Sequence, residues 1–343
     1  MYKRSQNTFR GHCVLLWMLL CFSLIACVAI AQPKAIINDT LPPVHDPVII
    51  REGGMYYVFC TGRGISVFSS PDMRHWTQLD PVFDKAPEWT VKAIPSFRNH
   101  VWAPDISYHN GLYYLYYAVS AFGKNTSCIG VATNKTLDPA SKDFHWTDHG
   151  KVIQSVPGRD MWNAIDPNLL IDDQDTPWLS FGSFWNGIKL VKLDAGLTRI
   201  AEPETWFTIA SRPRNFIYPD SVAGDAAIEA PFIYKHDKYY YLFVSFDYCC
   251  RGEKSTYKIM VGRSEQIIGP YIDRDGVALN LGGGSTVLEG NKDWHGVGHN
   301  AVAAFDGKDY LIYHAYDAND KGHSKLKIEA IRWWNGWPAI EGN

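Results

Sequence analysis

Acidic residues recur at similar points along the chain, and their spacing could bring them together at one site. Asp46, Asp105, Asp166 and Glu229 follow one another at intervals of 59, 61 and 63 residues, and His299 follows after a further 70. Carboxylates that converge on one cavity cannot all ionise at little cost, so at least one should have a raised pKa. The pattern therefore predicts a site that holds and transfers protons.

A neutral carboxylic acid beside an ionised carboxylate is the arrangement that cleaves glycosidic bonds. The acid protonates the leaving oxygen, and the carboxylate either activates a water molecule or attacks the sugar. The structural alternative is that each Asp-Pro pair simply begins a strand, with its carboxylate bonded to nearby backbone N–H groups. That alternative accounts well for one Asp-Pro pair, but less well for three carboxylates that recur in register.

The segments that must position these residues read as short strands. Aromatic and β-branched runs alternate with Gly, Asn and Asp, and helical periodicity is nearly absent, which is typical of all-β proteins. His45–Ile49, for example, leads through a turn to Met55–Phe59, and Ile228–Phe232 leads in the same way to Tyr239–Phe243. Three further units share this layout, which makes five in all.

Five such units predict a single-domain, five-bladed β-propeller in which each blade is a four-stranded antiparallel sheet. A β-sandwich is the alternative, but it leaves unexplained why each unit opens with a polar residue. In a propeller the innermost strands all face the central axis. The five leading residues are therefore expected to form a polar ring around one cavity.

Aromatic residues near the predicted ring suggest a ligand that binds by stacking. Trp102, Phe122, Trp162 and Trp185 lie close in sequence to the leading residues, and aromatics make up 14% of the chain. Sugar rings place their C–H faces on aromatic rings while their hydroxyl groups find polar partners. For any single one of these residues, packing within a blade is the alternative.

Composition and charge exclude several other classes of function. The 343 residues carry a net charge of −3, and no cluster of Lys and Arg follows the first ten residues. A protein that tracks nucleic-acid phosphates needs a basic face, so nucleic-acid binding is excluded. No C-x-x-C or H-E-x-x-H spacing predicts zinc, and no glycine-rich lysine loop predicts a nucleotide.

The N-terminus resembles an export signal. A basic start is followed by an apolar run from Cys13 to Ile30, and Ala29–Ala31 has the small-x-small pattern of a signal-peptidase site. We therefore expect a signal peptide at residues 1–31 and a mature catalytic domain at residues 32–343. Leu24–Cys27 also resembles a lipobox, with Cys27 acylated. The protein is thus expected in the periplasm or outside the cell, with a lipid-anchored form as the alternative.

Four cysteines remain after the signal segment: Cys60, Cys128, Cys249 and Cys250. They are too few and too scattered for a disulfide scaffold. The adjacent Cys249 and Cys250 could close a strained ring or pair elsewhere, and reduced or structural cysteines are the alternative.

Several longer motifs surround or lie between these carboxylates in the sequence: Val44–Pro47, Val101–Asp105, Tyr116–Gly123, Trp162–Pro167, Phe181–Trp185, Ile228–Phe232 and Gly298–Asn300. With these motifs the chain resembles glycoside hydrolase family 43, and within it the endo-α-1,5-L-arabinanases. The similarity runs from about His45 to Trp337. It implies cleavage of internal α-1,5-L-arabinofuranosidic bonds in the arabinan backbone.

The resemblance also implies roles for individual residues. Asp46 would be the general base that deprotonates the attacking water, and Glu229 the general acid that protonates the leaving oxygen. Asp166 would modulate the pKa of Glu229 and orient it. Because members of the family invert the anomeric configuration, the two catalytic carboxyls should lie roughly 6.5–9.5 Å apart. Residues expected to bind the substrate are Trp102, Phe122, Gly123, Trp162, Asn163, Ala164, Ile165, Ser183, Phe184 and Trp185.

His299 is the least expected member of the ring, because a single histidine is most often a structural hydrogen-bonding group. In similar arabinanases the matching histidine binds a cation on the axis, so the resemblance implies a metal site at His299, with calcium the expected ion. Because such ions prefer oxygen ligands, water would complete the shell. The positive charge would keep Asp46 and Asp166 ionised. Asp105 matches a family motif without a catalytic role, and it is expected to be structural or to line the groove.

Other functions remain open from the sequence. The enzyme could attack chain ends or act processively, or it could be a β-xylosidase or an α-L-arabinofuranosidase. A sugar-binding propeller without catalysis is the alternative from another class, although all three carboxylate positions are filled. The expected ligands are arabinan and arabino-oligosaccharides. The sequence indicates no obligate protein partner and is compatible with a monomer.

Overall fold

The computed structural model describes residues 36–37 and 41–340. The predicted signal peptide and the lipobox at Cys27 lie outside the described residues. Strands dominate the described part, which also contains one short α-helix, α1 (Glu88–Ala93), and three 3-10 turns at Gly252–Lys254, Leu279–Leu281 and Ala318–Asp320. None of the helices in the described ranges has the length and apolar character needed to cross a membrane.

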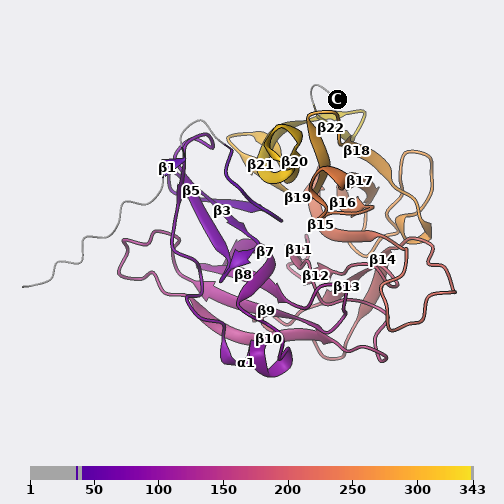
Figure 1. The fold of residues 1–343 in the computed structure, drawn as a ribbon, viewed down its shortest axis with the longest axis horizontal. Helices are drawn as coiled ribbons and strands as arrows, with labels where there is room; N and C mark the ends of the chain where they lie inside the picture. Colours follow the sequence, from indigo (N-terminus) through magenta and orange to yellow (C-terminus); the bar gives the residue numbers. More distant parts are fainter. Residues whose placement is uncertain (1–35, 38–40, 341–343) are drawn as a thin grey trace, which may run out of the picture. The chain divides into compact units, whose positions relative to one another are not determined.

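The strands form five antiparallel sheets arranged around a centre, so the predicted five-bladed β-propeller is confirmed (Figure 1). The first sheet has the order β1 (Ile36–Ile37), β6 (Trp76–Gln78), β5 (Ser66–Ser70), β3 (Met55–Cys60) and β2 (Val48–Glu52). The second has the order β10 (Thr147–Ser155), β9 (Ser127–Asn134), β8 (Leu112–Val119), β7 (His100–His109) and β4 (Gly62–Arg63).

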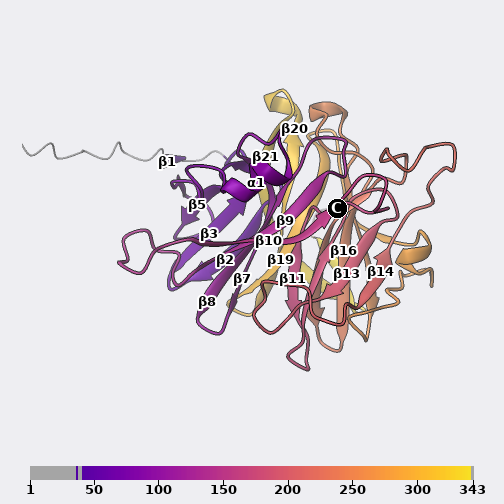
Figure 2. The ribbon, with the colours of Figure 1, turned by 90° about the horizontal axis from the view of Figure 1, so that it is seen from below.

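The other three sheets each contain four strands that follow one another in sequence. They are β11 (Asn168–Ile171), β12 (Pro177–Phe181), β13 (Ile188–Lys192) and β14 (Trp206–Ala210); β15 (Ile228–His236), β16 (Tyr239–Phe246), β17 (Lys258–Ser264) and β18 (Ser285–Glu289); and β19 (Trp294–Phe305), β20 (Lys308–Asp317), β21 (His323–Trp334) and β22 (Trp337–Ile340). Figure 2 shows the strands of neighbouring blades standing side by side. Each sequence unit thus becomes one blade.

Two-residue turns join the first and second strands of two blades. Asn110 and Gly111 connect β7 to β8, and Asp306 and Gly307 connect β19 to β20, all four with positive φ. Such turns match the right-handed twist of the strands that they join. They fix the register of β7 and of β19, the strand that carries His299.

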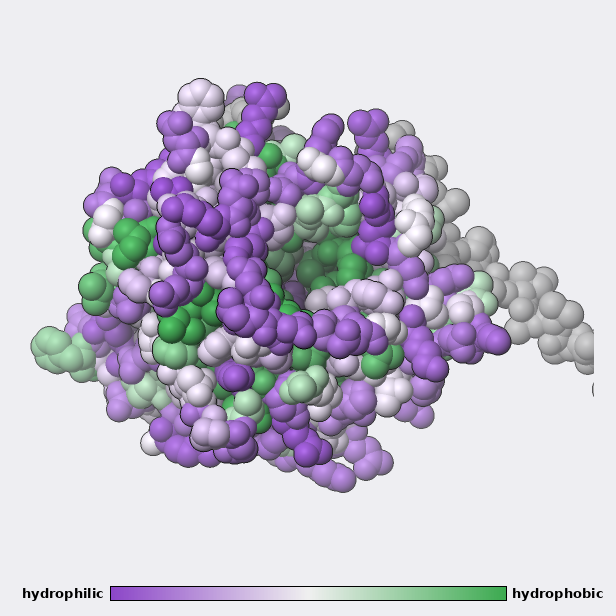
Figure 3. All heavy atoms as spheres, turned by 180° about the vertical axis from the view of Figure 1, so that it is seen from behind, coloured by the Kyte–Doolittle hydropathy of each residue, from purple (hydrophilic) through white to green (hydrophobic). Residues whose placement is uncertain are grey.

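The hydrophobic core lies mainly between adjacent sheets. β9 is buried along its whole length, and the largest apolar cluster joins residues of the first, second and fifth blades. Figure 3 shows the face that is turned away in Figure 1, where hydrophobic residues, coloured green, surround a hollow near the middle.

The innermost strands share a backbone feature that corrects the predicted ring. Asp46, Ala103, Asp166, Ala230 and His299 all have positive φ, between 42° and 57°. In β7, β15 and β19 this residue sits in a β-bulge, which re-aims neighbouring side chains. These five are therefore the equivalent positions. Our expectation that Asp105 and Glu229 occupy them is wrong: Asp105 lies two residues after its blade's position, and Glu229 lies one residue before.

The first and fifth blades meet where the chain closes the propeller. Arg51 of β2 forms an ion pair of 2.9 Å with Asp306, and the Leu326 N–H of β21 donates to the Pro42 carbonyl at 2.9 Å. Because Asp46 lies two residues before β2, the candidate base lies beside this closure.

Candidate active site

A pocket of about 890 Å³ opens near the beginnings of the innermost strands. It brings together both predicted catalytic carboxyls, the predicted orienting residue and most of the predicted substrate-binding residues. Those that line it are Asp46, Trp102, Phe122, Gly123, Asn163, Ile165, Asp166, Ser183, Phe184, Trp185, Glu229 and His299. Phe122 is 79% exposed, so its ring stands free at the site, whereas the indole of Trp185 is buried and donates to the Asp220 carbonyl at 2.9 Å.

The structure places three of the residues singled out from the sequence away from this pocket. Trp162 packs its ring against Phe181 and Trp206 in the core. Ala164 is fully buried, and its side chain belongs to the same apolar cluster. Asp105 is 3% exposed and faces the next blade, so the groove-lining alternative for it is excluded.

Asp46 is held by donors on both of its carboxylate oxygens. Its Oδ1 lies 2.7 Å from His45 Nδ1 and 3.0 Å from His299 Nδ1, and its Oδ2 accepts from Thr61 Oγ1 at 2.5 Å. Burial raises the pKa of Asp46, but the charges and hydrogen bonds of the two imidazoles outweigh it and hold that pKa well below the usual range. Asp46 is therefore ionised at neutral pH.

Each side-chain partner of Asp46 is placed to donate a proton to its carboxylate. Thr61 Oγ1 accepts the Ala103 N–H at 2.8 Å, so its own proton is free to point at Asp46. His45 Nε2 lies 2.7 Å from the hydroxyl of Tyr316. Because a carboxylate can only accept, we assign a proton to His45 Nδ1, which donates to Asp46. All of these partners favour the charged carboxylate.

The backbone of Asp46 is anchored to the fifth blade. Its N–H donates to His314 Nδ1 at 3.1 Å. Burial lowers the pKa of His314 well below the usual range, so this imidazole is neutral and its Nδ1 can accept. The closure between the first and last blades thus fixes the position of the candidate base.

Glu229 has a different kind of environment. Its Oε2 accepts from Ser183 Oγ and its Oε1 from Tyr257 Oη, both at 2.7 Å. A hydroxyl can donate to a carboxylate and can also accept from a carboxylic acid. Glu229 can therefore gain and lose a proton without leaving either partner unsatisfied, as a general acid must.

Asp166 connects the two halves of the site. Its Oδ2 accepts the backbone N–H of Ala230 at 3.1 Å, which fixes the chain directly after Glu229. Burial raises the pKa of Asp166 well above its usual range; the charge of His299 opposes this shift, and the carboxylates of Glu229 and Asp46 add to it. The sequence predicts a raised pKa for at least one carboxyl of the ring, and the pKa of Asp166 is raised in this way.

His299 could contribute one nitrogen ligand to a cation. Burial lowers its pKa, but the carboxylates of Asp46 and Asp166 outweigh burial and raise that pKa to about 9. Its Nδ1 faces Asp46, and within the described ranges Nε2 makes no hydrogen bond to the protein. A cation at Nε2 would replace a proton there. The clusters of three or more possible ligands in these ranges do not include His299, so water would have to supply the rest of the shell.

Asp105 instead links neighbouring blades. Its Oδ2 accepts the Leu169 N–H at 2.8 Å and its Oδ1 accepts from Asn168 Nδ2 at 3.3 Å, while Asn168 Oδ1 accepts the Ile233 N–H. Burial raises the pKa of Asp105 to about 6. This chain of bonds joins β7, β11 and β15, and it gives Asp105 a structural role.

We expect Asp105→Ala to lower the free energy of unfolding by about 1–3 kcal/mol, because the Leu169 N–H would be left buried without a partner. The kcat of the folded variant should stay within about twofold of wild type, since Asp105 does not reach the pocket. Urea denaturation and initial rates measure the two quantities. A large loss of kcat at unchanged stability would contradict the structural role.

Sequence reasoning missed several residues that shape the site. Thr61, Tyr257 and Tyr316 come from outside the repeated leading segments, and no spacing pattern marks them. His45 lies in the motif Val44–Pro47, but its residue type alone indicates no role. The adjacent Cys249 and Cys250 form a disulfide beside Glu229.

Comparison with known proteins bears on this geometry. The model of the family described as Glycosyl hydrolases family 43 matches residues 40–338. The chain is 54% identical to the extracellular exo-α-(1→5)-L-arabinofuranosidase of Cellvibrio japonicus, covering 87% of this chain and 86% of that protein. It is 42% identical to the extracellular endo-α-(1→5)-L-arabinanase 1 of Bacillus subtilis, covering 86% and 87%.

A solved structure resembles the whole propeller. The α-L-arabinanase of Cellvibrio cellulosa in complex with arabinohexaose superposes with a TM-score of 0.87 at 53% identity, covering 88% of this chain and 96% of that one. The likeness therefore extends over all five blades and the pocket between them.

Proposed function

The chain belongs to glycosyl hydrolases family 43, and on that premise we propose that it hydrolyses the α-1,5-L-arabinofuranosidic bonds of the arabinan backbone with inversion of configuration. It is a glycoside hydrolase of the arabinanase and arabinofuranosidase type. The observation that carries the proposal is the contrast between its two catalytic carboxyls. The partners of Asp46 donate hydrogen bonds that favour its charged form, whereas the hydroxyl partners of Glu229 can either donate or accept.

The reaction follows from this contrast. Ionised Asp46 accepts a proton from a water molecule as the water attacks the anomeric carbon. Glu229 gives its proton to the departing oxygen, and Ser183 and Tyr257 turn their hydroxyls to stabilise the carboxylate that results. Asp166 holds the backbone beside Glu229 through the Ala230 N–H, and we give it the role of a positioning residue. Inversion requires room for water between the base and the sugar.

The mode of attack is the finer part of the proposal. We place release from chain ends first, because the relative at 54% identity is named as an exo-acting enzyme. Internal cleavage, which the sequence motifs implied, is the second candidate, because the Bacillus subtilis relative at 42% identity is named as an endo-acting enzyme. The names of both relatives also describe them as extracellular, which favours export of this chain and agrees with the predicted signal peptide.

Product analysis on debranched linear arabinan, sampled from the earliest minutes, tests the activity and its mode together. A single short product from the outset, with slow loss of viscosity, would establish attack from chain ends. A ladder of oligomers with rapid loss of viscosity would establish internal cleavage instead. No cleavage of arabinan, xylan or aryl glycosides would contradict the hydrolase and favour a sugar-binding protein.

We further propose that a hydrated divalent cation, calcium by resemblance, binds at Nε2 of His299. When bound, it would supply positive charge beside Asp46 and Asp166. Calcium should then raise the melting temperature of the wild-type protein, because a ligand that binds only the folded state stabilises it. A chelator should reverse the effect.

His299→Asn is the matched variant for this metal site. Asparagine tolerates the positive φ of 50° at this position but lacks the imidazole ligand. The calcium-dependent shift in melting temperature should disappear in this variant. An equal shift in the variant and the wild type would place the ion elsewhere.

A further inference from the structure

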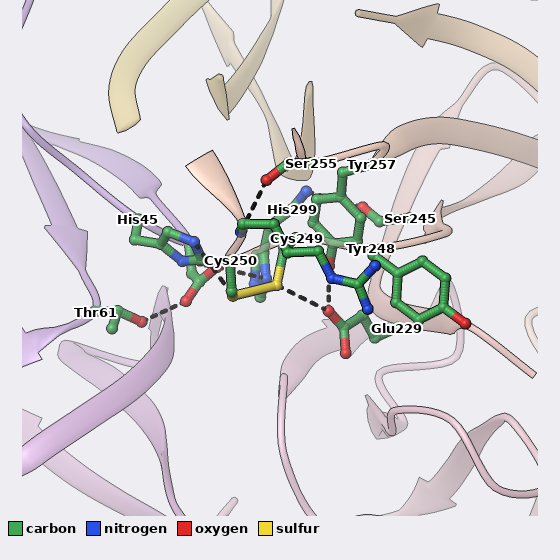
Figure 4. Close-up of a disulfide and its surroundings, with 12 residues drawn as sticks. His45, Thr61, Glu229, Ser245, Tyr248, Cys249, Cys250, Ser255, Tyr257 and His299 are labelled. Carbon is green, nitrogen blue, oxygen red and sulfur yellow. Dashed lines mark hydrogen bonds and ion pairs between the residues drawn. A yellow bond between two sulfur atoms is a disulfide. The ribbon is translucent and has the colours of Figure 1, made fainter. Parts of the chain in front are cut away.

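The Cys249–Cys250 disulfide lies between the two catalytic halves of the pocket (Figure 4). Cys249 Sγ is 3.7 Å from Glu229 Oε1, and Cys250 Sγ is 3.8 Å from Nε2 of His45, the residue that donates to Asp46. Both cysteines line the pocket, and Cys250 is exposed to it. The sulfurs therefore face the space that a sugar must occupy to be cleaved.

The segment that carries the disulfide is tied down at several points. The N–H groups of Thr256 and Tyr257 both donate to the Tyr248 carbonyl, at 2.9 and 3.1 Å, which closes the segment at its base. The Cys250 N–H donates to Tyr316 Oη at 2.7 Å, and the Arg251 N–H donates to Ser255 Oγ at 3.0 Å. The disulfide is thus presented by a fixed backbone.

The chemistry of this surface suits the face of a sugar ring. A disulfide has no hydrogen to donate, accepts hydrogen bonds only weakly, and is polarizable, so it contacts apolar groups favourably. The groups around it, Asp46, Glu229 and His45, are polar or charged and suit hydroxyls. A furanose ring that lies between acid and base has both kinds of surface, because its hydroxyls and its C–H bonds point in different directions.

We infer that the Cys249–Cys250 disulfide is a substrate-binding surface, on which the C–H face of the sugar ring at the cleavage point packs while its hydroxyls face the carboxylates. This inference rests on the proposed function and adds to it a contact at the reacting sugar. It also gives the oxidised state of the pair a functional reason: two separate thiols would carry weak S–H donors and would no longer form one closed apolar surface.

The test measures the affinity for linear α-1,5-arabinohexaose by calorimetry in the inactive Glu229→Gln background. Adding Cys249→Ser and Cys250→Ser should weaken binding by about tenfold, since the sulfur contacts and the closed surface are both lost. Reduction of the disulfide by a water-soluble phosphine should weaken binding to a similar degree. Thiol titration of the denatured protein confirms that two additional thiols have formed.

The double serine variant is its own control for reduction. It retains Cys60 and Cys128, which are free and buried, so any effect of the phosphine through them would persist in it. We expect its affinity to be unchanged by the phosphine. Melting temperatures of all proteins show whether the propeller remains folded.

A second variant distinguishes the effect of losing the disulfide surface from the effect of loosening the backbone that carries it. Tyr316→Phe removes the acceptor of the Cys250 N–H and the partner of His45, but leaves the disulfide intact. In an otherwise active enzyme it should lower kcat through Asp46, whereas loss of the disulfide should mainly raise KM. Only this inference is overturned if the wild type cleaves arabinan while the serine variant and the reduced protein both bind arabinohexaose within twofold of their controls. If the wild type neither binds nor cleaves arabinan, the proposed function is contradicted as well.

Discussion

Replacing Glu229 with Gln is expected to lower kcat on linear arabinan by about 10²- to 10⁴-fold, the usual contribution of a general acid. Glutamine preserves the shape of the side chain and can still bond to Ser183 and Tyr257, so the fold should be intact. The loss should be much smaller on an arabino-oligosaccharide with a 4-nitrophenol leaving group, because that group departs without a proton. Initial rates on both substrates measure the difference.

The matched control is Glu253→Gln. Glu253 is an exposed glutamate in the same segment as the disulfide, but it does not line the pocket. We expect this variant to keep wild-type rates on both substrates. The role of Glu229 as acid would be contradicted if Glu229→Gln cleaved arabinan at the wild-type rate. It would also be contradicted if kcat fell by the same factor on both substrates.

Asp46→Asn should lower kcat by a similar factor, about 10²- to 10⁴-fold, because the attacking water would lose its base. Asparagine is the appropriate substitution, since Asp46 has a φ of 54° and asparagine tolerates that conformation better than alanine does. Azide needs no deprotonation before it attacks. It should therefore restore turnover in this variant and yield a glycosyl azide of inverted configuration.

Asp175→Asn is the control for backbone conformation. Asp175 also has a positive φ, of 60°, but it lies exposed in the turn between β11 and β12. This variant should be indistinguishable from wild type with and without azide. If azide failed to accelerate Asp46→Asn while the variant remained folded, or yielded a product of retained configuration, the assignment of Asp46 as base would be contradicted.

The architecture could be predicted from the sequence because the repeat consists of residues with strong preferences for turns or for strands. Turn pairs such as Asn110-Gly111 and Asp306-Gly307 separate strands rich in aromatic and β-branched residues, and five such units leave few alternatives. The register of the ring could not be predicted so well. Its defining feature is a positive φ, and in two blades the residue with that conformation is an alanine, Ala103 or Ala230, which carries no signal in the sequence.

The candidate carboxyls were predicted because they stand at repeated positions or in recognisable motifs. Their partners were not, since Thr61, Tyr257 and Tyr316 approach from other strands, and only the folded chain shows which of them face the pocket. The same holds for the disulfide. Adjacency of Cys249 and Cys250 suggested a ring, but its position between His45 and Glu229 depends on the whole fold.

The site lies where the propeller closes, and this connects stability to activity. Asp46 belongs to the first blade, while His299, His314 and Tyr316 belong to the fifth. Contacts that join the ends of the chain therefore also position the candidate base. Changes that loosen the closure should impair catalysis before they unfold the other blades.

The central claim is that Asp46 and Glu229 act as base and acid in an inverting hydrolysis of arabinan. The most direct test is ¹H NMR of the first product released from a linear α-1,5-arabino-oligosaccharide, recorded before mutarotation. The account predicts that the new reducing end appears first as the β-anomer and then equilibrates. If the α-anomer appears first, configuration is retained, and the assignment of the two carboxyls as base and acid is contradicted.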